Sequence, residues 1–262
     1  MKVEKVEAHI VGWLKDYIKQ SGTKGFVVGV SGGIDSALTS ALVARTGYPV
    51  VCVEMPIHQS KEQVNRAMAH IDDLQKDFKN VLLERVDLTD VFDKLINALP
   101  SAGEEDARHL SLVNSRARLR MTTLYYFAGL YGYLVAGTGN KVEDFGVGFY
   151  TKYGDGGVDL SPIADLTKTE VYELAEHVGV RNDIMDAPPT DGLWGDDRTD
   201  EDQIGASYPE LEWAMEQYNQ SKRPEDFEGR KKEVFRIYSN LHHSNRHKMK
   251  PIPVCQIPDT YK

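Results

Sequence analysis

A short polar segment between an apolar run and a helical pattern carries the residues best suited to phosphate chemistry. Residues 26–30 are apolar, Ser31-Gly-Gly-Ile-Asp-Ser36 follows, and residues 37–44 have the pattern of a helix. We expect a buried strand, a tight turn and a helix N-terminus. The glycines let the backbone approach a ligand, and the helix start presents free N–H donors and a positive dipole end. The segment therefore predicts a pyrophosphate site.

Asp35 adds a carboxylate to this turn. A magnesium ion on a bound pyrophosphate would need such a hard oxygen ligand. The segment lacks the Gly-Lys-Ser/Thr of a Walker loop and the third glycine of a dinucleotide fingerprint. A glycine-rich turn that binds nothing is the alternative interpretation. The complete string after a strand resembles the loop of N-type ATP pyrophosphatases, which split ATP into AMP and pyrophosphate, but the loop alone does not select a member of that group.

Alternating strand and helix patterns in the first half of the chain must position this turn. The expected strands are residues 26–30, 48–55, 81–86 and 131–136. The expected helices are residues 3–18, 37–44, 64–74, 91–99 and 110–130. This alternation predicts a doubly wound α/β fold, with a mostly parallel sheet and helices on both faces, whose ligands bind at the carboxyl ends of the strands.

The second half of the chain has a different pattern. Helices are expected over residues 169–178, 207–218 and 224–241, and residues 186–203 are expected to form a long polar loop, which we interpret as a mobile lid. A basic and then proline-rich tail follows from residue 242. No interdomain linker is evident, so we expect residues 1–262 to form a single domain.

Composition excludes several classes of function. The formal net charge of −9 argues against nonspecific nucleic-acid binding, so an anionic substrate must meet locally clustered Lys and Arg. Cys52 and Cys255 are far apart and suggest neither a disulfide framework nor a zinc site. No signal peptide or membrane span is expected. We therefore expect a cytoplasmic protein without nucleic-acid or membrane partners.

Further polar motifs follow the turn along the chain. They are Asn114-Ser-Arg-Ala-Arg-Leu-Arg-Met121, Gly137-Thr-Gly-Asn-Lys-Val-Glu143, the glycine-rich stretch 149–159, and the helix start 166–170, with Thr167 or Thr169 as its cap. Taken singly, they fit a solvated basic helix face, a strand-end turn, a surface loop and an ordinary helix cap.

In this order, the motifs resemble the ammonia-dependent NAD synthetase family from Gly25 to Lys248. The motifs that carry the resemblance are SGGIDS, NSRARLRM, GTGNKVE, FYTKYGDGG, LTKTE, PPTDGLW, DEDQIGASYPELE and RHK. The chain departs from many bacterial members at Gly139 and Asn140, where Asp and His are common, and after Thr190. The glutamine-dependent members carry an amidase domain that this chain is expected to lack, so free ammonia, or ammonia from another protein, is the expected nitrogen donor.

The resemblance implies an adenine nucleotide alpha-hydrolase-like, Rossmann-like fold and the conversion of deamido-NAD, ATP and ammonia to NAD, AMP and pyrophosphate. It implies an ATP site at Gly29, Val30, Ser31, Gly32, Gly33, Ile34, Asp35, Ser36, Thr138, Lys168 and Thr190. It implies a deamido-NAD site at Arg118, Lys152, Asp159, His247 and Lys248, and Mg²⁺ ligands at Asp35 and Glu143. A homodimer is also implied, with residues 124–127 as a candidate contact surface.

Two residues are expected to be catalytic. Lys168 would neutralise phosphate charge, and Asp155 would accept a proton from ammonium if burial raises its pKa. Asp155 shaping the turn is the alternative. The competing functions are another adenylating synthetase, acting on a different carboxylate or a nucleobase carbonyl, and a nucleotide sensor without chemistry. The presence of Asp35, Glu143 and Lys168 argues against the sensor.

Overall fold

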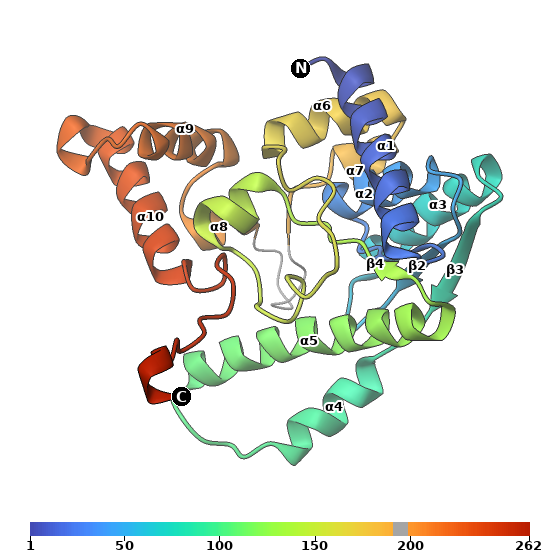
Figure 1. Cartoon of the computed structure of the whole chain (residues 1–262), viewed down its shortest axis with the longest axis horizontal. Coiled ribbons are helices and arrows are strands. Elements are labelled where there is room, and N and C mark those ends of the chain that lie inside the picture. The colour runs from blue at the N-terminus through green and yellow to red at the C-terminus, as the bar shows by residue number, and fades with distance from the viewer. Residues whose placement is uncertain (191–198) are drawn as a thin grey trace.

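Four parallel strands form the central sheet of the computed structural model, which describes residues 1–190 and 199–262 (Figure 1). The strands are β1 (Phe26–Gly29), β2 (Val50–Glu54), β3 (Val81–Arg85) and β4 (Leu134–Val135). Their order is β3-β2-β1-β4, and Phe26 of β1 pairs with Val50 on one side and Leu134 on the other. This sheet with its flanking helices confirms the predicted α/β class.

The order of the strands fixes where a ligand can bind. The chain runs outward from β1 to β2 and β3 and then returns to β4 on the other side of β1. The segments that leave β1 and β4 therefore diverge, and they open a crevice at the carboxyl ends of these two strands. The Ser31–Ser36 turn and the segment that begins at Gly137 both start at this crevice.

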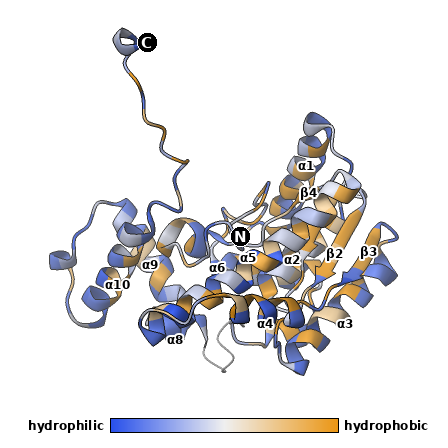
Figure 2. Cartoon of the chain, turned by 90° about the horizontal axis from the view of Figure 1, so that it is seen from below, coloured by the Kyte–Doolittle hydropathy of each residue, from blue (hydrophilic) through white to orange (hydrophobic). Residues whose placement is uncertain are grey.

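Helices cover both faces of the sheet (Figure 1). One face is covered by α1 (Val3–Ser21), α2 (Ile34–Ala44), α3 (Lys61–Asp77), α6 (Lys168–Val178) and α7 (Asn182–Met185). The other face is covered by α4 (Thr89–Ala98) and α5 (Glu105–Tyr131). Leu14, Leu38 and Leu174 are fully buried in the first core, and Phe92 is buried in the second. Figure 2 shows the apolar strands between these helices.

A third apolar cluster lies beside the sheet and brings in the second half of the chain. It is built by the π-helix η1 (Val142–Val147), α8 (Asp200–Ile204), α9 (Tyr208–Asn219) and α10 (Gly229–Asn245). Two short 3-10 helices, η2 (Pro224–Asp226) and η3 (Asp259–Tyr261), complete this half of the chain. Leu211, Phe235 and Tyr238 are its buried centre. The backbone N–H of Thr169 donates to the Glu212 carboxylate at 2.8 Å, which joins α6 to α9.

Several predicted boundaries were wrong. The strand predicted over residues 131–136 begins only at Leu134, because α5 continues to Tyr131 and ends where Gly132 takes a left-handed φ of 69°. The same helix begins at Glu105, five residues before the predicted start at residue 110. The predicted loop 186–203 overlaps the short helix α8, which begins at Asp200 after a capping box between Thr199 and Asp202. Residues 191–198 of the predicted lid lie outside the described residues.

The C-terminal segment 251–262, called the arm below, extends away from the body (Figure 2). All of its residues are exposed, and its apolar side chains Ile252, Val254, Ile257 and Tyr261 are 54–82% exposed. Among the described residues, no helix combines the length and apolar character needed to cross a membrane.

Candidate active site

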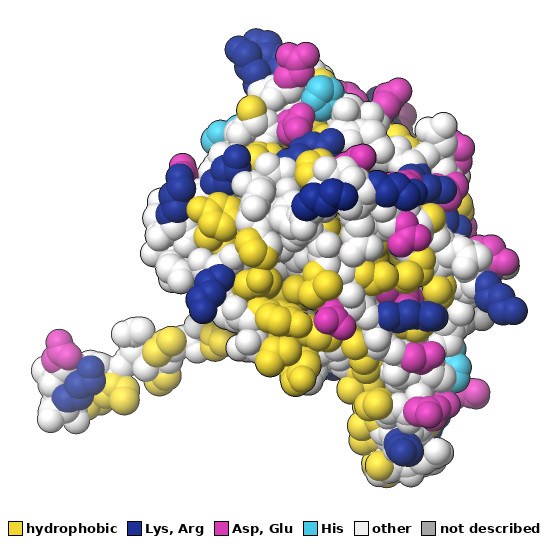
Figure 3. All heavy atoms as spheres, turned by 90° about the vertical axis from the view of Figure 1, so that its right-hand side faces the viewer, with side chains coloured by type: hydrophobic (Ala, Val, Ile, Leu, Met, Phe, Trp, Pro, Cys, Tyr) yellow, Lys and Arg dark blue, Asp and Glu magenta, His cyan; other side chains and the backbone are white. Residues whose placement is uncertain are grey.

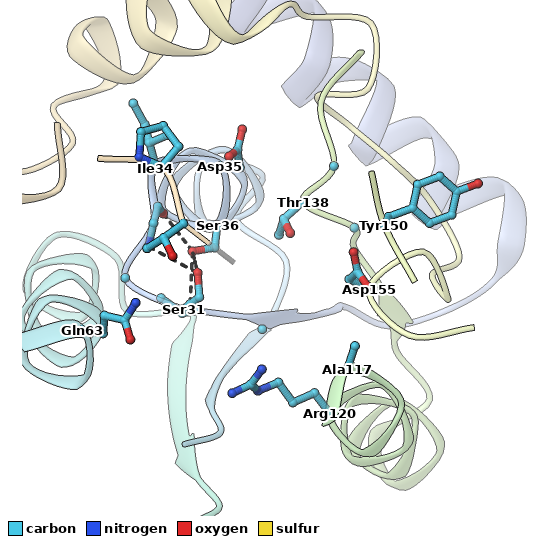
Figure 4. A pocket seen from close by; sticks show the side chains of 18 of the residues that line it. Ser31, Ile34, Asp35, Ser36, Gln63, Ala117, Arg120, Thr138, Tyr150 and Asp155 are labelled. Atoms are coloured by element: carbon cyan, nitrogen blue, oxygen red, sulfur yellow. Dashed lines mark hydrogen bonds between the residues drawn. The ribbon is translucent and has the colours of Figure 1, made fainter. Parts of the chain in front are cut away.

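The turn after β1 is braced by its own serines (Figure 4). The Ser36 hydroxyl donates to the Gly33 carbonyl at 2.9 Å and accepts from the Ser31 N–H at 3.1 Å. The Ser31 hydroxyl lies 3.1 Å from the Ser36 hydroxyl and accepts from the Gly33 N–H. Gly33 caps α2, so the first N–H groups of that helix have no acceptor within the helix and face the crevice. The turn therefore has a fixed shape, and its free helix N–H groups are available to an anion.

Gly32 is required at this turn for two reasons. Its φ is +83°, which side chains rarely adopt, and an added Cβ would lie 2.6 Å from the Gln63 carbonyl oxygen of α3. Any other residue would push the turn away from α3. The close approach also lets Arg66 of α3 donate to the Gly32 carbonyl at 3.4 Å.

Lys168 joins the two predicted metal ligands. Its ammonium lies 2.6 Å from Asp35 Oδ2 and 3.1 Å from Glu143 Oε1. The three residues come from the starts of α6, α2 and η1, which lie far apart in the sequence. Thr167 caps α6 through a complete capping box, so Lys168 is the first residue of the helix and is held in place. The predicted cap at Thr167 is confirmed, and the Thr169 alternative is wrong.

The protonation of this cluster follows from its burial and its charges. Burial lowers the pKa of Lys168, but the carboxylates of Asp35 and Glu143 outweigh that effect and raise it above the ordinary lysine value. Lys168 is therefore charged at neutral pH. Burial raises the pKa of Asp35, and the positive charge of Lys168 opposes that rise. A charged lysine only 3% exposed is suited to stabilise a polyphosphate.

Asn140, one of the departures from the bacterial pattern, connects the two predicted metal ligands. Its buried side-chain amide donates to Asp35 Oδ1 at 3.3 Å. Its side-chain oxygen accepts from the backbone N–H groups of Val142 and Glu143, each at 3.1 Å. The amide fixes the start of η1 relative to Asp35, so Asn at this position is structurally consistent with an intact carboxylate pair.

Gly139, the other departure, is explained by Asp144. A Cβ on Gly139 would lie 2.2 Å from both carboxylate oxygens of Asp144. The Asp144 carboxylate thus fills the space that a side chain at position 139 would need. Burial, reinforced by Glu143 and Asp155, raises the pKa of Asp144 to about 8. An Asp at position 139 would clash with this group and add a further negative charge.

A pocket of about 270 Å³ opens between the turn and the end of β4 (Figure 4). Its walls include the turn, Thr138, Lys168, Thr190 and Asp155, which brings together all of the predicted ATP residues and both predicted catalytic residues. In Figure 4, Asp155 and Thr138 lie on the wall opposite the turn. The predicted deamido-NAD residues do not line this pocket.

Asp155, the predicted proton acceptor, lies in the glycine-rich turn at the pocket wall. The turn 149–159 is irregular, as predicted, and the Thr151 N–H donates to Asp155 Oδ1 at 2.9 Å. Asp155 is an exposed residue on the pocket wall, yet the protein around its carboxyl raises the pKa of that group to about 6, against the opposing effect of the Thr151 bond. The group is therefore ionised at pH 7 and is a stronger base than an ordinary aspartate.

The predicted deamido-NAD residues form a second group next to the pocket. Arg118 donates to the Lys152 carbonyl at 3.3 Å, and the Lys152 ammonium donates to the His247 carbonyl at 2.9 Å. Lys248 donates to the carbonyls of Gly148 and Tyr150, at 2.8 and 2.7 Å. The end of α10 is thus tied to the glycine-rich turn, and three cationic side chains gather there.

Asp159 has a different environment from these cations. Its carboxylate accepts from the Tyr125 hydroxyl at 2.9 Å and from the Val135 N–H at 2.8 Å. It therefore pins the turn to α5 and β4. Of the candidate contact surface 124–127, Phe127 is buried, Leu124 lines the pocket, and Tyr126 is 63% exposed.

Sequence reasoning missed several residues that line the pocket. They are Glu54, Gln63, Arg66, Arg120, Asp144 and Asp200. Arg120 points from α5 toward the pocket (Figure 4), donating to the Met55 carbonyl at 3.1 Å and to Gln59 at 2.7 Å. The NSRARLRM motif contained Arg120, but its spacing did not indicate which arginine faces inward. Glu54 ends β2, so its place at the carboxyl edge of the sheet was the available signal.

The donor set of the carboxylate cluster suits a magnesium ion. Asp35 and Glu143 offer hard oxygen ligands that already converge on one cation, the Lys168 ammonium. Glu143 Oε1 is engaged by Lys168 and Tyr208, which leaves its second carboxylate oxygen directed away from those two contacts. The residues therefore fit the metal that the resemblance implies.

The order of the parallel strands and the helices that flank them are those of the adenine nucleotide alpha-hydrolase-like fold. The model of the NAD synthase family matches residues 6–252. The chain belongs to the NAD synthase family.

Relatives and solved structures agree with this assignment. The chain is 38% identical to an NH(3)-dependent NAD(+) synthetase of Carboxydothermus hydrogenoformans over 80% of this chain and 83% of that protein. Its fold is similar to that of an NMN synthetase from Francisella tularensis, with a TM-score of 0.84, 28% identity and 99% of each chain covered. It is also similar to an NH3-dependent NAD synthetase from Campylobacter jejuni solved with a nitrate ion, with a TM-score of 0.77 and 26% identity over 98% of this chain and 100% of the other.

Proposed function

We propose that this protein is an ammonia-dependent NAD synthetase, which amidates deamido-NAD at the cost of ATP and so performs the last step of NAD biosynthesis. The observation that carries the proposal is that the Ser31–Ser36 turn, Lys168 and Asp155 all line one pocket. A phosphate site, a charged lysine and a base with a raised pKa are the three groups that adenylation followed by amidation needs. The family relationship supports the same reaction.

The first step makes the carboxylate reactive. A carboxylate oxygen of the nicotinate ring attacks the α-phosphorus of ATP, and the bond from that phosphorus to the pyrophosphate breaks. The turn N–H groups and Lys168 stabilise the charge that develops on the phosphates. Gly29 to Ser36, Thr138 and Thr190 hold the nucleotide in line with the carboxylate.

Asp35 and Glu143 would hold a magnesium ion on the polyphosphate. When bound, the ion would neutralise part of the charge on the leaving pyrophosphate. The approach of ATP would also give Lys168 a second set of anionic partners besides the two carboxylates that it contacts in the free protein.

The second step forms the amide. Ammonium has no lone pair, so a proton must leave before the nitrogen attacks the acyl-adenylate. Asp155, with a pKa of about 6, accepts that proton at the pocket wall. The carbon–nitrogen bond then forms, the nitrogen loses a second proton to solvent, and the bond to AMP breaks, with AMP keeping the oxygen that came from the carboxylate.

Deamido-NAD would lie against the cationic group beside the pocket. Arg118, Lys152, His247 and Lys248 gather there, and Asp159 fixes the turn that carries Lys152. The protein has a net charge of −9 and would repel a dinucleotide that carries a pyrophosphate. The locally clustered cations would offset this repulsion at the binding site.

We also propose a cytoplasmic homodimer of single-domain chains. Tyr126 and Leu130 of α5 are 63% and 58% exposed, and Figure 3 shows apolar side chains gathered on this side of the molecule. The apolar side chains of the arm are also exposed and could pack against a partner subunit. Exposed patches of this kind mark interfaces.

A second substrate is suggested by one solved neighbour. An NMN synthetase from Francisella tularensis has a similar fold, with a TM-score of 0.84 and 28% identity over 99% of each chain. Nicotinate mononucleotide carries the same carboxylate as deamido-NAD but lacks its AMP half. The same two steps would then yield NMN.

A direct comparison of the two substrates tests the proposal. The purified protein is supplied with ATP, magnesium and ammonium and with either deamido-NAD or nicotinate mononucleotide, and NAD, NMN, AMP and pyrophosphate are measured. We expect a higher kcat/KM for deamido-NAD, with equal amounts of NAD, AMP and pyrophosphate. Preference for nicotinate mononucleotide would select the second substrate, and ATP binding without either product would support a nucleotide sensor.

A further inference from the structure

Tyr208 belongs to the DEDQIGASYPELE motif, to which no role has yet been assigned, and it lies at the centre of the site. It is the first residue of α9 and is only 4% exposed. Its hydroxyl lies 2.5 Å from Glu143 Oε1 and 3.2 Å from Asp200 Oδ2. The Lys168 ammonium lies 4.7 Å from the centre of its ring. The Tyr208 side chain therefore contacts both Lys168 and Glu143.

The backbone around Tyr208 is held tightly. Ser207 caps α9 through a capping box with Glu210, and the Tyr208 N–H donates to Glu201 Oε1 at 2.8 Å. The phenol is thus anchored at the backbone by α8 and α9 and at its tip by Glu143. Such double anchoring lets the hydroxyl set the orientation of its partner rather than follow it.

The hydroxyl carries one proton, and the shorter contact identifies Glu143 as its acceptor. Both Tyr208 and Lys168 bond the same oxygen, Oε1. Without the hydroxyl, only Lys168 of these two groups would still hold Glu143, and its second oxygen would be directed less strictly to one place. The ring also lies against Lys168, which limits where the ammonium can move.

We propose that Tyr208 is a positioning residue that orients Glu143 for a divalent cation and confines Lys168 beside it. The inference rests on the proposed function, because it takes Glu143 as a ligand of the metal on ATP. It also gives a role to the DEDQIGASYPELE stretch, which supplies Asp200, Glu201 and Tyr208. The Asp200 N–H donates to the Pro189 carbonyl at 3.0 Å, so the same stretch is joined to the pocket wall next to Thr190.

The test compares Tyr208→Phe with Tyr218→Phe, the same change on the same helix at a residue that does not line the pocket. Phenylalanine keeps the ring over Lys168 and removes only the hydroxyl. Binding of Mn²⁺, as a probe for magnesium, is measured by electron paramagnetic resonance with a non-hydrolysable ATP analogue present. Pyrophosphate release is measured against magnesium concentration, and folding by circular dichroism.

We expect Tyr208→Phe to weaken Mn²⁺ binding about tenfold, the lower range for loss of a partner that orients a metal ligand. Pyrophosphate release should need correspondingly more magnesium and recover in part at saturation, while Tyr218→Phe behaves as wild type. Unchanged Mn²⁺ affinity, or loss of folding in Tyr208→Phe, would overturn the inference. If wild type binds Mn²⁺ with the analogue but makes no NAD, the proposed function fails and the positioning role is still decided by the Mn²⁺ comparison.

Discussion

The substitution Asp155→Asn separates base catalysis from a structural role of the glycine-rich turn. Asparagine keeps the oxygen that accepts from the Thr151 N–H, so the turn should keep its shape. It removes the proton acceptor. We therefore expect adenylation to continue at a rate close to that of wild type, while amide formation slows.

The size and pH dependence of the effect follow from the raised pKa. With a pKa of about 6, the Asp155 carboxylate is mostly ionised at pH 7 and mostly protonated at pH 5. General base catalysis contributes about 10² to 10⁴-fold, and free ammonia still reaches the variant, so we expect a loss of about 100-fold at pH 7. The wild-type-to-variant ratio of amidation rates should be constant above about pH 7 and fall roughly tenfold per unit below pH 6.

The assay follows the two half-reactions separately. Adenylation is measured by exchange of labelled pyrophosphate into ATP with deamido-NAD and no ammonium, and amidation by NAD formation at fixed total ammonium. Taking the ratio between proteins cancels the change of free ammonia with pH. Equal losses in both half-reactions, or a ratio that does not depend on pH, would refute the base and assign Asp155 a structural role.

Three further outcomes are expected. Asp35→Asn should nearly abolish pyrophosphate release with an unchanged circular dichroism spectrum; normal release would remove Asp35 from the metal site. Burial lowers the pKa of His70 to about 4, and the ring lies 2.9 Å from the Ser40 hydroxyl. Between about pH 6.5 and 4 the unfolded chain therefore binds a proton at this histidine that the folded protein does not. The free energy of unfolding should fall by roughly 3 kcal/mol over that range. His70→Gln should flatten that pH dependence in denaturant titrations, and an unaltered slope would contradict the assignment. Replacing both Tyr126 and Leu130 by Glu should give a monomer by light scattering, and a persistent dimer would place the interface elsewhere.

The sequence predicted the parts of the site that local patterns encode. The apolar run, the glycines and the helix start were enough to place the Ser31–Ser36 turn, and alternation along the chain was enough for a parallel sheet. The capping pattern placed Lys168 at a helix start, and the structure adds its contacts with Asp35 and Glu143.

Other parts depend on distant segments and could not be read locally. Tyr208 reaches Glu143 only because α9 folds against η1, and Asp144 fills the space at Gly139 only through the unusual turn of that π-helix. The predicted start of β4 was wrong because tyrosine is common in strands. Tyr131 and Tyr133 therefore favoured a strand, whereas Tyr131 is the last residue of α5. Packing between elements decided these cases.

The central claim is that the carboxylate of deamido-NAD becomes bonded to AMP before ammonia attacks. Deamido-NAD labelled with ¹⁸O in both oxygens of its nicotinate carboxylate, converted with ATP, magnesium and ammonium, tests it most directly. Mass spectrometry should find one ¹⁸O in the phosphate of AMP, one in the amide of NAD, and none in pyrophosphate. Unlabelled AMP, or label in pyrophosphate or inorganic phosphate, would contradict the account.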